Sequence, residues 1–340
     1  MATNYSGKQW QAVVALRDQS ASAIGSGAGD FVSNSNLFME LDTVNGIAFD
    51  GGLQSSEAVK AGRRMLHDED MVQHYGSGTW TWDFDYLVKN EVLIQNLLGL
   101  IYNGGDVTTA LTIPAAPVDE DLSHGAGGST DRTAEILLLA PTSPAGLEDE
   151  DMRLQSAVLQ NLTLSMDMGT DGGRLRASGQ FMSGYKPIIG DAGVTGVTTA
   201  SNYEKSLFDM GTRTIAGTST VTVKSFSVTI SNPATRVGFQ GTAGETDGYV
   251  RGGAVDITGS MTVKYDGTTA DWLTAKYLGG AGNSIAITME EGASFSFALA
   301  AARLTGFNKD YAEDGMFVEI PFKATAGADG ASVPLIVKCT

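Results

Sequence analysis

A strand-turn-helix segment that occurs twice is the feature that most constrains the fold of this chain. The first copy contains GTWTWDFD (residues 78–85) and the second GSMTVKYD (residues 259–266), at an offset of 181 residues (259 minus 78). Polar residues match polar residues and apolar residues match apolar residues at every position. One side of each segment is apolar and the other polar, which is typical of a half-buried β-strand. We therefore predict two tandem copies of one unit.

A helical pattern follows each of these strands. Apolar residues recur at Ile94, Leu97 and Leu98 in the first copy and at Trp272, Leu273 and Tyr277 in the second. Either Thr268 or Thr269 is the expected N-cap of the second helix, and the glycine pair at 279–280 is its expected end. Each unit is thus predicted to carry one flanking α-helix.

A second pair of segments extends the repeat. Residues 162–172 (LTLSMDMGTDG) and residues 320–330 (IPFKATAGADG) each end in a Gly/Asp turn, at an offset of 158 (327 minus 169). Each predicts a β-hairpin, whose second strand lies at 174–181 or at 332–337. The smaller offset predicts 23 extra residues (181 minus 158) in the first copy. We assign them to the acidic, Pro- and Gly-rich loop at 114–132.

The predicted fold class is mainly β, with two tandem β-sandwich or barrel units. Residues 1–45 are expected to form an N-terminal arm, residues 46–200 the first unit with its loop 114–132, and residues 201–340 the second unit. Residues 134–140 (AEILLLA) read as a buried strand. Residues 218–230 alternate in polarity on either side of Lys224 and Ser225, which predicts a further strand.

Charge and cysteine content exclude several classes of protein. The formal net charge of −17 argues against a surface that grips nucleic acid, because phosphate contacts need clustered Lys and Arg. It is compatible with a surface that nucleic acid passes without adhering. The single cysteine, Cys339, excludes an intramolecular disulfide and a cysteine-cluster zinc site. No stretch has the ~20 apolar residues of a membrane span, and the N-terminus lacks a signal-peptide layout, so we expect folding in the cytoplasm.

Motifs of catalysis and metal binding are absent from the sequence. There is no G-x-S-x-G, Walker A or H-E-x-x-H pattern. The segment from Asp167 to Gly172 imitates a calcium loop, but Gly169 and Ser178 stand where its third and twelfth positions need ligands. Acidic runs at 68–70, 119–121 and 148–151 are expected to be solvated loops. We predict a non-enzymatic protein without cofactor or metal; its three histidines lack ligand spacing (His67, His74 and His124).

The order of elements in the second copy resembles that of phage tail tube proteins, specifically the long, two-unit major tail proteins of siphophages. The likeness is carried by SFSVTISNPATRVGFQG (225–241), YVRGGAVDITGSMTVKYDGTTADWLTAKYL (249–278), ASFSFALAAARLTG (293–306) and MFVEIPFKATAGADGASVPLIV (316–337). The opening KQWQAVVALRDQSASAIG (8–25) is similar to the arm of that family.

This resemblance implies a structural virion protein whose sheets join around a ring into one barrel. Two units per chain imply a homotrimeric ring with pseudo-sixfold symmetry; a hexamer with the second unit outside the bore is the alternative. Implied partners are further copies of the chain in stacked rings, the tape-measure protein, and the tail terminator and distal tail proteins. The genome DNA passes through the bore without specific binding, and no membrane is involved. The implied location is the virion tail, assembled in the host cytoplasm, with the arm and the loop 114–132 as candidate clasps between rings.

Polar positions on the two repeated strands are the candidate bore-facing residues. Their apolar neighbours, including Trp80 and Trp82, are expected in the core. A competing hypothesis is a non-catalytic surface or carbohydrate-binding β-sandwich, which would expose a cluster of aromatic side chains. The candidate bore-facing residues are Thr79, Thr81, Asp83, Ser260, Thr262 and Lys264.

Overall fold

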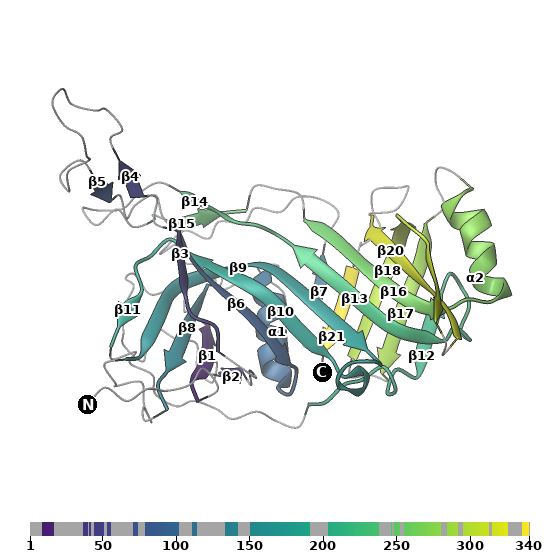
Figure 1. Cartoon of the computed structure of the whole chain (residues 1–340), viewed down its shortest axis with the longest axis horizontal. Helices are drawn as coiled ribbons and strands as arrows, with labels where there is room; N and C mark the ends of the chain where they lie inside the picture. Colours follow the sequence, from purple (N-terminus) through teal and green to yellow (C-terminus); the bar gives the residue numbers. More distant parts are fainter. Residues whose placement is uncertain are drawn as a thin grey trace.

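The computed structural model shows a mainly β protein, elongated along one axis (Figure 1). Two α-helices occur among the described residues: α1 (Glu91–Ile101) and α2 (Gly267–Trp272), which continues as the π-helical turn η5 (Leu273–Tyr277). Neither is long and apolar enough to cross a membrane. The described residues are 9–16, 37–39, 41, 44–50, 53–55, 71–73, 79–101, 111–113, 133–141, 150–190, 203–237, 246, 248–251, 255–279, 284–291, 295–312, 315–325 and 335–339.

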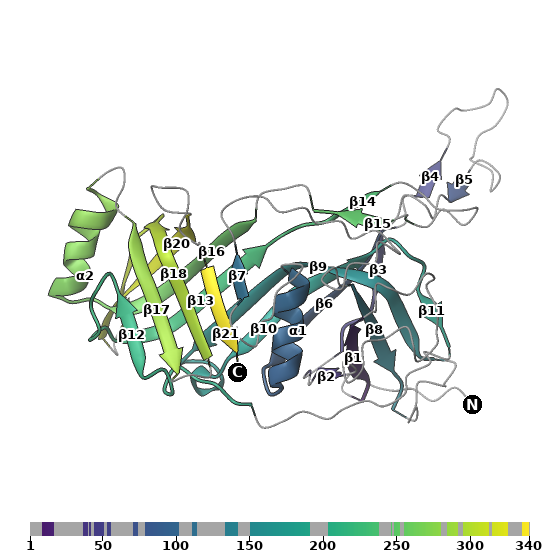
Figure 2. The same ribbon diagram turned by 180° about the vertical axis from the view of Figure 1, so that it is seen from behind.

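A central antiparallel sheet runs through both halves of the chain. Its order is β3-β6-β10-β9-β13-β16-β20-β19, so strands from the first half occupy four places and strands from the second half the other four. The two halves meet where β9 pairs with β13 (Figures 1 and 2). The strands are β3 (Ala48–Asp50), β6 (Thr79–Leu87), β10 (Arg176–Ser183), β9 (Met152–Asp167), β13 (Val223–Ser231), β16 (Asp256–Lys264), β20 (Gly315–Ala324) and β19 (Asn308–Ala312).

Further strands join the sheet in both halves, through β9 in the first half and through β20 in the second. In the first half, the beginning of β9 pairs with β8 and β11, β8 pairs with β1, and β1 pairs with β2. In the second half, β18 pairs with β17, β20 and β21, β12 adds to β17, and β7 adds to β21. These strands are β1 (Gln11–Leu16), β2 (Leu37–Met39), β7 (Leu111–Ile113), β8 (Ala134–Leu139), β11 (Ile188–Ile189), β12 (Thr212–Ile215), β17 (Ile285–Glu291), β18 (Phe295–Leu304) and β21 (Leu335–Cys339).

Two short hairpins lie outside this sheet. One consists of β4 (Leu53–Ser55) and β5 (Met71–Gln73), and the other of β14 (Thr235–Val237) and β15 (Gly248–Val250). The side chains of Tyr185 and Tyr249 make an edge-on contact with ring centroids 6.3 Å apart. This contact joins the β14–β15 hairpin to the segment that follows β10.

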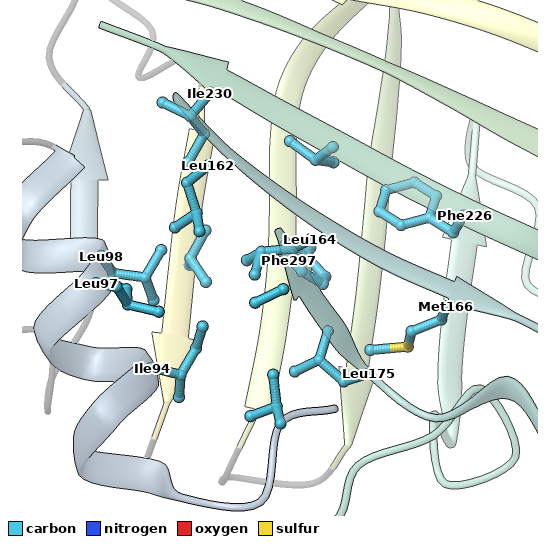
Figure 3. Close-up of a cluster of buried hydrophobic side chains, with 14 of the residues drawn as sticks. Ile94, Leu97, Leu98, Leu162, Leu164, Met166, Leu175, Phe226, Ile230 and Phe297 are labelled. Atoms are coloured by element: carbon cyan, nitrogen blue, oxygen red, sulfur yellow. The ribbon is translucent and has the colours of Figure 1, made fainter. Parts of the chain in front are cut away.

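One cluster of buried apolar side chains continues from the first half into the second. Figure 3 shows Ile94, Leu97 and Leu98 of α1 in this cluster, together with Leu162 of β9 and Phe297 of β18. The helix begins after Asn90, whose side-chain oxygen accepts a hydrogen bond from Leu93 N at 3.2 Å, as an N-cap does. The apolar residues of α1 recur at helical spacing and are buried on one face, which contacts β9 of the first half and β21 of the second half.

Most of the elements predicted from alternation and helical spacing are confirmed. The two repeated strands are β6 and β16, the first predicted hairpin is β9–β10, and residues 134–140 contain the buried strand β8. The predicted break at Lys224 and Ser225 is a shift in register between β13 and β16. The predicted N-cap of α2 is wrong: Asp266 is the N-cap, and Thr269 at the third helical position completes a capping box.

The predicted final hairpin is wrong. Strands β20 and β21 do not pair with each other; both pair with β18, β20 through residues 322–324 and β21 through residues 336–339. They follow one another along the same edge of β18, which local alternation cannot distinguish from a hairpin. The true hairpin of β20 is with β19, across residues 313–314. The figure of 23 extra residues rested on the wrong hairpin and fails with it.

Several predicted segments lie outside the described residues. They include most of the arm, the loop 114–132, the acidic run 68–70 and the three histidines (His67, His74 and His124). Within the predicted arm, β1 pairs along its whole length with β8, and residues 12–15 are buried. This part of the arm belongs to the sheet of the first half.

Gly259 is a position where the fold leaves no room for a side chain. An added Cβ would lie 2.3 Å from the Ser227 carbonyl oxygen and 2.5 Å from the Phe322 ring. Gly179 of β10 is similar, with Asn161 O at 2.4 Å and the Phe84 ring at 3.0 Å. In each case a phenylalanine on the adjacent strand covers the glycine.

We expect Gly259→Ala to lower the free energy of unfolding by about 1–3 kcal/mol, because overpacking forces the two strands apart. Urea unfolding of the purified subunit measures this. Gly99→Ala on α1 is the matched control, since a Cβ there meets nothing within 4 Å. The control should stabilise by up to about 1 kcal/mol through helix propensity. Equal urea midpoints for Gly259→Ala and the wild type would contradict the packing argument.

Candidate functional site

The six candidate residues lie on one face of the central sheet. Thr79, Thr81 and Asp83 alternate along β6 with side chains that point into the core, among them Trp82 and Phe84. On β16 the buried Met261 and Val263 alternate in the same way with the other three candidates (Ser260, Thr262 and Lys264). The candidates therefore occupy the face opposite the core. They are not adjacent, because β10, β9 and β13 lie between their two strands.

The intervening strands make this face continuous and polar. Register places Ser178 beside Thr163, Thr163 beside Thr229, and Thr229 beside Thr258. We call this the polar face; the three intervening strands contribute to it Arg176, Ser178, Gln180, Asn161, Thr163, Ser165, Asp167, Ser225, Ser227, Thr229 and Ser231. Sequence reasoning missed these residues, although 161–167 and 225–231 show the same alternation that identified β6 and β16.

Short side chains bond to one another across the polar face. The hydroxyls of Thr163 and Thr229 lie 2.8 Å apart where the two halves meet, and those of Ser227 and Ser260 lie 3.1 Å apart. Gln180 Nε2 donates to Asp83 Oδ1 at 2.8 Å. Because these cross-strand pairs consume donors and acceptors within the sheet, fewer remain for a ligand.

Carboxylates neutralise part of the positive charge on the polar face. Arg176 pairs with Asp85 at 3.1 Å and also with Asp171, while Lys323 Nζ lies 2.5 Å from Asp256. Burial lowers the pKa of Arg176, but its hydrogen bonds and proximity to Asp171 and Asp85 outweigh burial and raise the pKa above its usual value. The described side chains of the central strands place five carboxylates (Asp83, Asp85, Asp167, Asp256 and Glu319) and four cations (Arg176, Lys224, Lys264 and Lys323) on this face, so the described part of it is net negative by one charge.

The segment that imitates a calcium loop is the turn between β9 and β10. Asp167 Oδ1 accepts a hydrogen bond from Gly169 N at 2.8 Å, and Asp171 pairs with Arg176. Asp171 and Gly172 have φ of 53° and 66°, as the sequence predicts for a Gly/Asp turn. Its carboxylates thus act within the hairpin, and the described part of the chain holds no group of three or more His, Cys, Asp and Glu able to bind a metal ion.

A family model described as phage tail tube protein matches residues 13–331. No curated protein matches the chain. The matched range begins in β1 and ends after β20, so it includes both halves of the central sheet and every strand of the polar face.

Proposed function

Because this chain belongs to the phage tail tube protein family, we propose that it forms stacked rings whose bore conducts the genome from head to host. The match over residues 13–331 carries this proposal. The chain is a structural tail tube protein and a component of the virion tail. We propose that it has no catalytic activity of its own.

The registers of the central sheet support two tandem units. The offset of 181 aligns Thr81 on β6 with Thr262 on β16. Their neighbours then align at constant offsets: 177 for β3 and β13 (225 minus 48), and 137 for β10 and β20 (319 minus 182). The hairpin strands β9 and β19 align at 149 (310 minus 161). In this alignment the first unit would have 32 more residues between β6 and β9 than the second unit has between β16 and β19 (181 minus 149).

The free edges of the central sheet support closure of a ring. Within the described strands, β3 pairs only with β6 and β19 only with β20. In the proposed correspondence, β19 is the counterpart of β9 and β3 that of β13. Transferred by these offsets, the register of the β9–β13 seam would place residues 310–312 of β19 in one copy opposite the residues that directly follow β3 in the next copy. Unpaired edges are covered in this way, and a contact of unlike surfaces closes into a ring.

The polar face is the proposed wall of the bore, with Thr79, Thr81 and Asp83 in one unit and Ser260, Thr262 and Lys264 in the other. Its net negative charge and the −17 of the whole chain repel phosphate, so DNA would pass without adhering. The alternative carbohydrate-binding function needs an exposed aromatic cluster. Trp82 is buried and Trp80 is packed against the core, which disfavours that alternative.

Two units per chain favour a homotrimeric ring with pseudo-sixfold symmetry over a hexamer. The proposed partners are further rings, the tape-measure protein inside the bore, and the tail terminator and distal tail proteins at the two ends. The arm 1–45 and the loop 114–132 are proposed clasps between rings, and assembly is proposed to take place in the host cytoplasm.

Negative-stain microscopy of concentrated, purified protein tests the assembly. Hollow filaments of constant width are expected, and persistent monomers, even with tape-measure protein added, would contradict the proposal. Lys309→Pro and Asp310→Pro test the edge of β19, because successive residues direct their N–H toward β20 or toward the free edge. One variant should leave the subunit stable but unable to form tubes, and the other should weaken the β19–β20 hairpin. Normal tubes from both variants would exclude pairing at this edge.

A further inference from the structure

We infer that the C-terminal end of α2 docks on the first half of the next copy of this chain, beside β11. We call this end the α2 tip and define it as Leu273, Tyr277 and Leu278. The inference rests on the proposed ring and deepens it, because it assigns a side-chain contact to the seam between copies. It is argued from the way α1 already packs within the chain.

Helix α1 packs across the junction of the two halves. It belongs to the first half, yet it contacts β21 of the second half as well as β9 of its own. Six of its side chains are buried, including Ile94, Leu97 and Leu98 (Figure 3). Beyond it, β7 of the first half pairs with β21. The helix that follows the repeated strand is therefore part of the contact with the neighbouring unit.

Helix α2 follows the equivalent strand, but within the described residues its π-helical end contacts β18 of its own half, and the other half does not cover it. Of residues 267–277, only Thr269 and Trp272 are buried. Leu278 is 66% exposed and Tyr277 is 38% exposed. By contrast, Leu97 and Leu98 near the C-terminal end of α1 are fully buried. Leu278 N donates to Leu273 O at 2.9 Å, which closes the π-helical turn. Single π-helical turns are frequent at functional sites.

The opposite end of the chain offers an apolar side chain for this tip. Ile189 of β11 is 71% exposed, the largest value among the exposed large apolar side chains of the described residues. Figure 1 places β11 and α2 at opposite ends of the long axis, as a head-to-tail contact between copies requires. Strand β11 borders the sheet of the first half through β9, much as β7 borders that of the second half through β21. Within one chain, α1 of the first half contacts β21 of the second half. In the ring, the α2 tip of one copy would contact β11 of the next copy in the corresponding way.

Leu278→Ser and the double variant with Tyr277→Ser test the docking. Because both side chains are exposed in the subunit, its thermal unfolding should not change. The concentration needed for tubes, measured by sedimentation, should rise about ten- to hundredfold, from the loss of one or two buried apolar side chains per contact. Val92→Ser is the matched control, since Val92 is a 45% exposed apolar residue on α1; its tubes should form as in the wild type.

Cross-linking identifies the partner surface. Leu278→Cys with Ile189→Cys, in a Cys339→Ser background, should give a ladder of disulfide-linked subunits when tubes are oxidised, but not when dilute monomers are. Leu278→Cys with Val92→Cys should give no ladder. The docking would be overturned, and the tube function left intact, by three results together: the wild type forms tubes, Leu278→Ser assembles as fully as the wild type, and the Leu278→Cys, Ile189→Cys variant gives no ladder. Absence of tubes from the wild type would overturn both.

Discussion

Glu135→Gln is expected to lower the free energy of unfolding by about 3–5 kcal/mol, because it leaves the guanidinium of Arg153 buried without its counter-charge. Glu135 on β8 and Arg153 on β9 are both fully buried, and Arg153 Nε donates to Glu135 Oε2 at 2.9 Å. The other carboxylate oxygen accepts a hydrogen bond from Ser156 N at 3.0 Å. Ser156 has a φ of 43° and lies where the register between β8 and β9 shifts. The carboxylate thus also holds an irregular strand in place.

Urea unfolding of the dilute subunit measures this effect, and two variants make it specific. Asp85→Asn removes a partner of Arg176 from an exposed pair, so it should cost less than about 1 kcal/mol. Glu135→Leu combined with Arg153→Met removes both charges and should recover most of the loss. A Glu135→Gln subunit as stable as Asp85→Asn would show that the buried pair does not support the fold.

Arg251→Met is expected to cost about 3–5 kcal/mol, because it removes several charge-assisted hydrogen bonds from a buried site. Arg251 follows β15 and is buried. Its guanidinium donates to Leu159 O at 2.8 Å, to Leu100 O at 3.0 Å and to Asn232 O. Leu100 is in the last turn of α1, where carbonyls lack partners within the helix and a positive charge is favourable. The substitution leaves these oxygens buried without their donor.

Arg303→Met is the control for Arg251, because Arg303 is exposed on β18 and should change stability by no more than about 0.5 kcal/mol. Asn232→Ala tests the same helix end, since Asn232 Nδ2 donates to Ile101 O at 3.0 Å. Loss of this single bond should cost less than the Arg251 variant. Unfolding curves of Arg251→Met and Arg303→Met that coincide would disprove the role assigned to Arg251.

Local sequence patterns predicted where the strands and helices lie better than they predicted which strands pair with one another. Alternation identified β6 and β16 because each has one buried face, and it placed the six candidate residues on the polar side. It failed for β21, whose partner β18 is distant in sequence and whose side chains would alternate equally beside β20. The sequence also could not predict the partners of the buried charged residues, because those partners are distant in sequence. Residues 134–140 read as a buried strand, but nothing local showed that Glu135 meets Arg153, or that Arg251 meets Leu100 from 151 residues away.

The sixteen residues of β9 also determine how the subunit unfolds. Its first part pairs with β8 and β11, and its second part pairs with β10 and β13, so one strand holds ladders in both halves. Neither half can lose β9 without breaking hydrogen bonds of the other. The two halves of the central sheet are therefore coupled into one cooperative unit rather than two independent foldons.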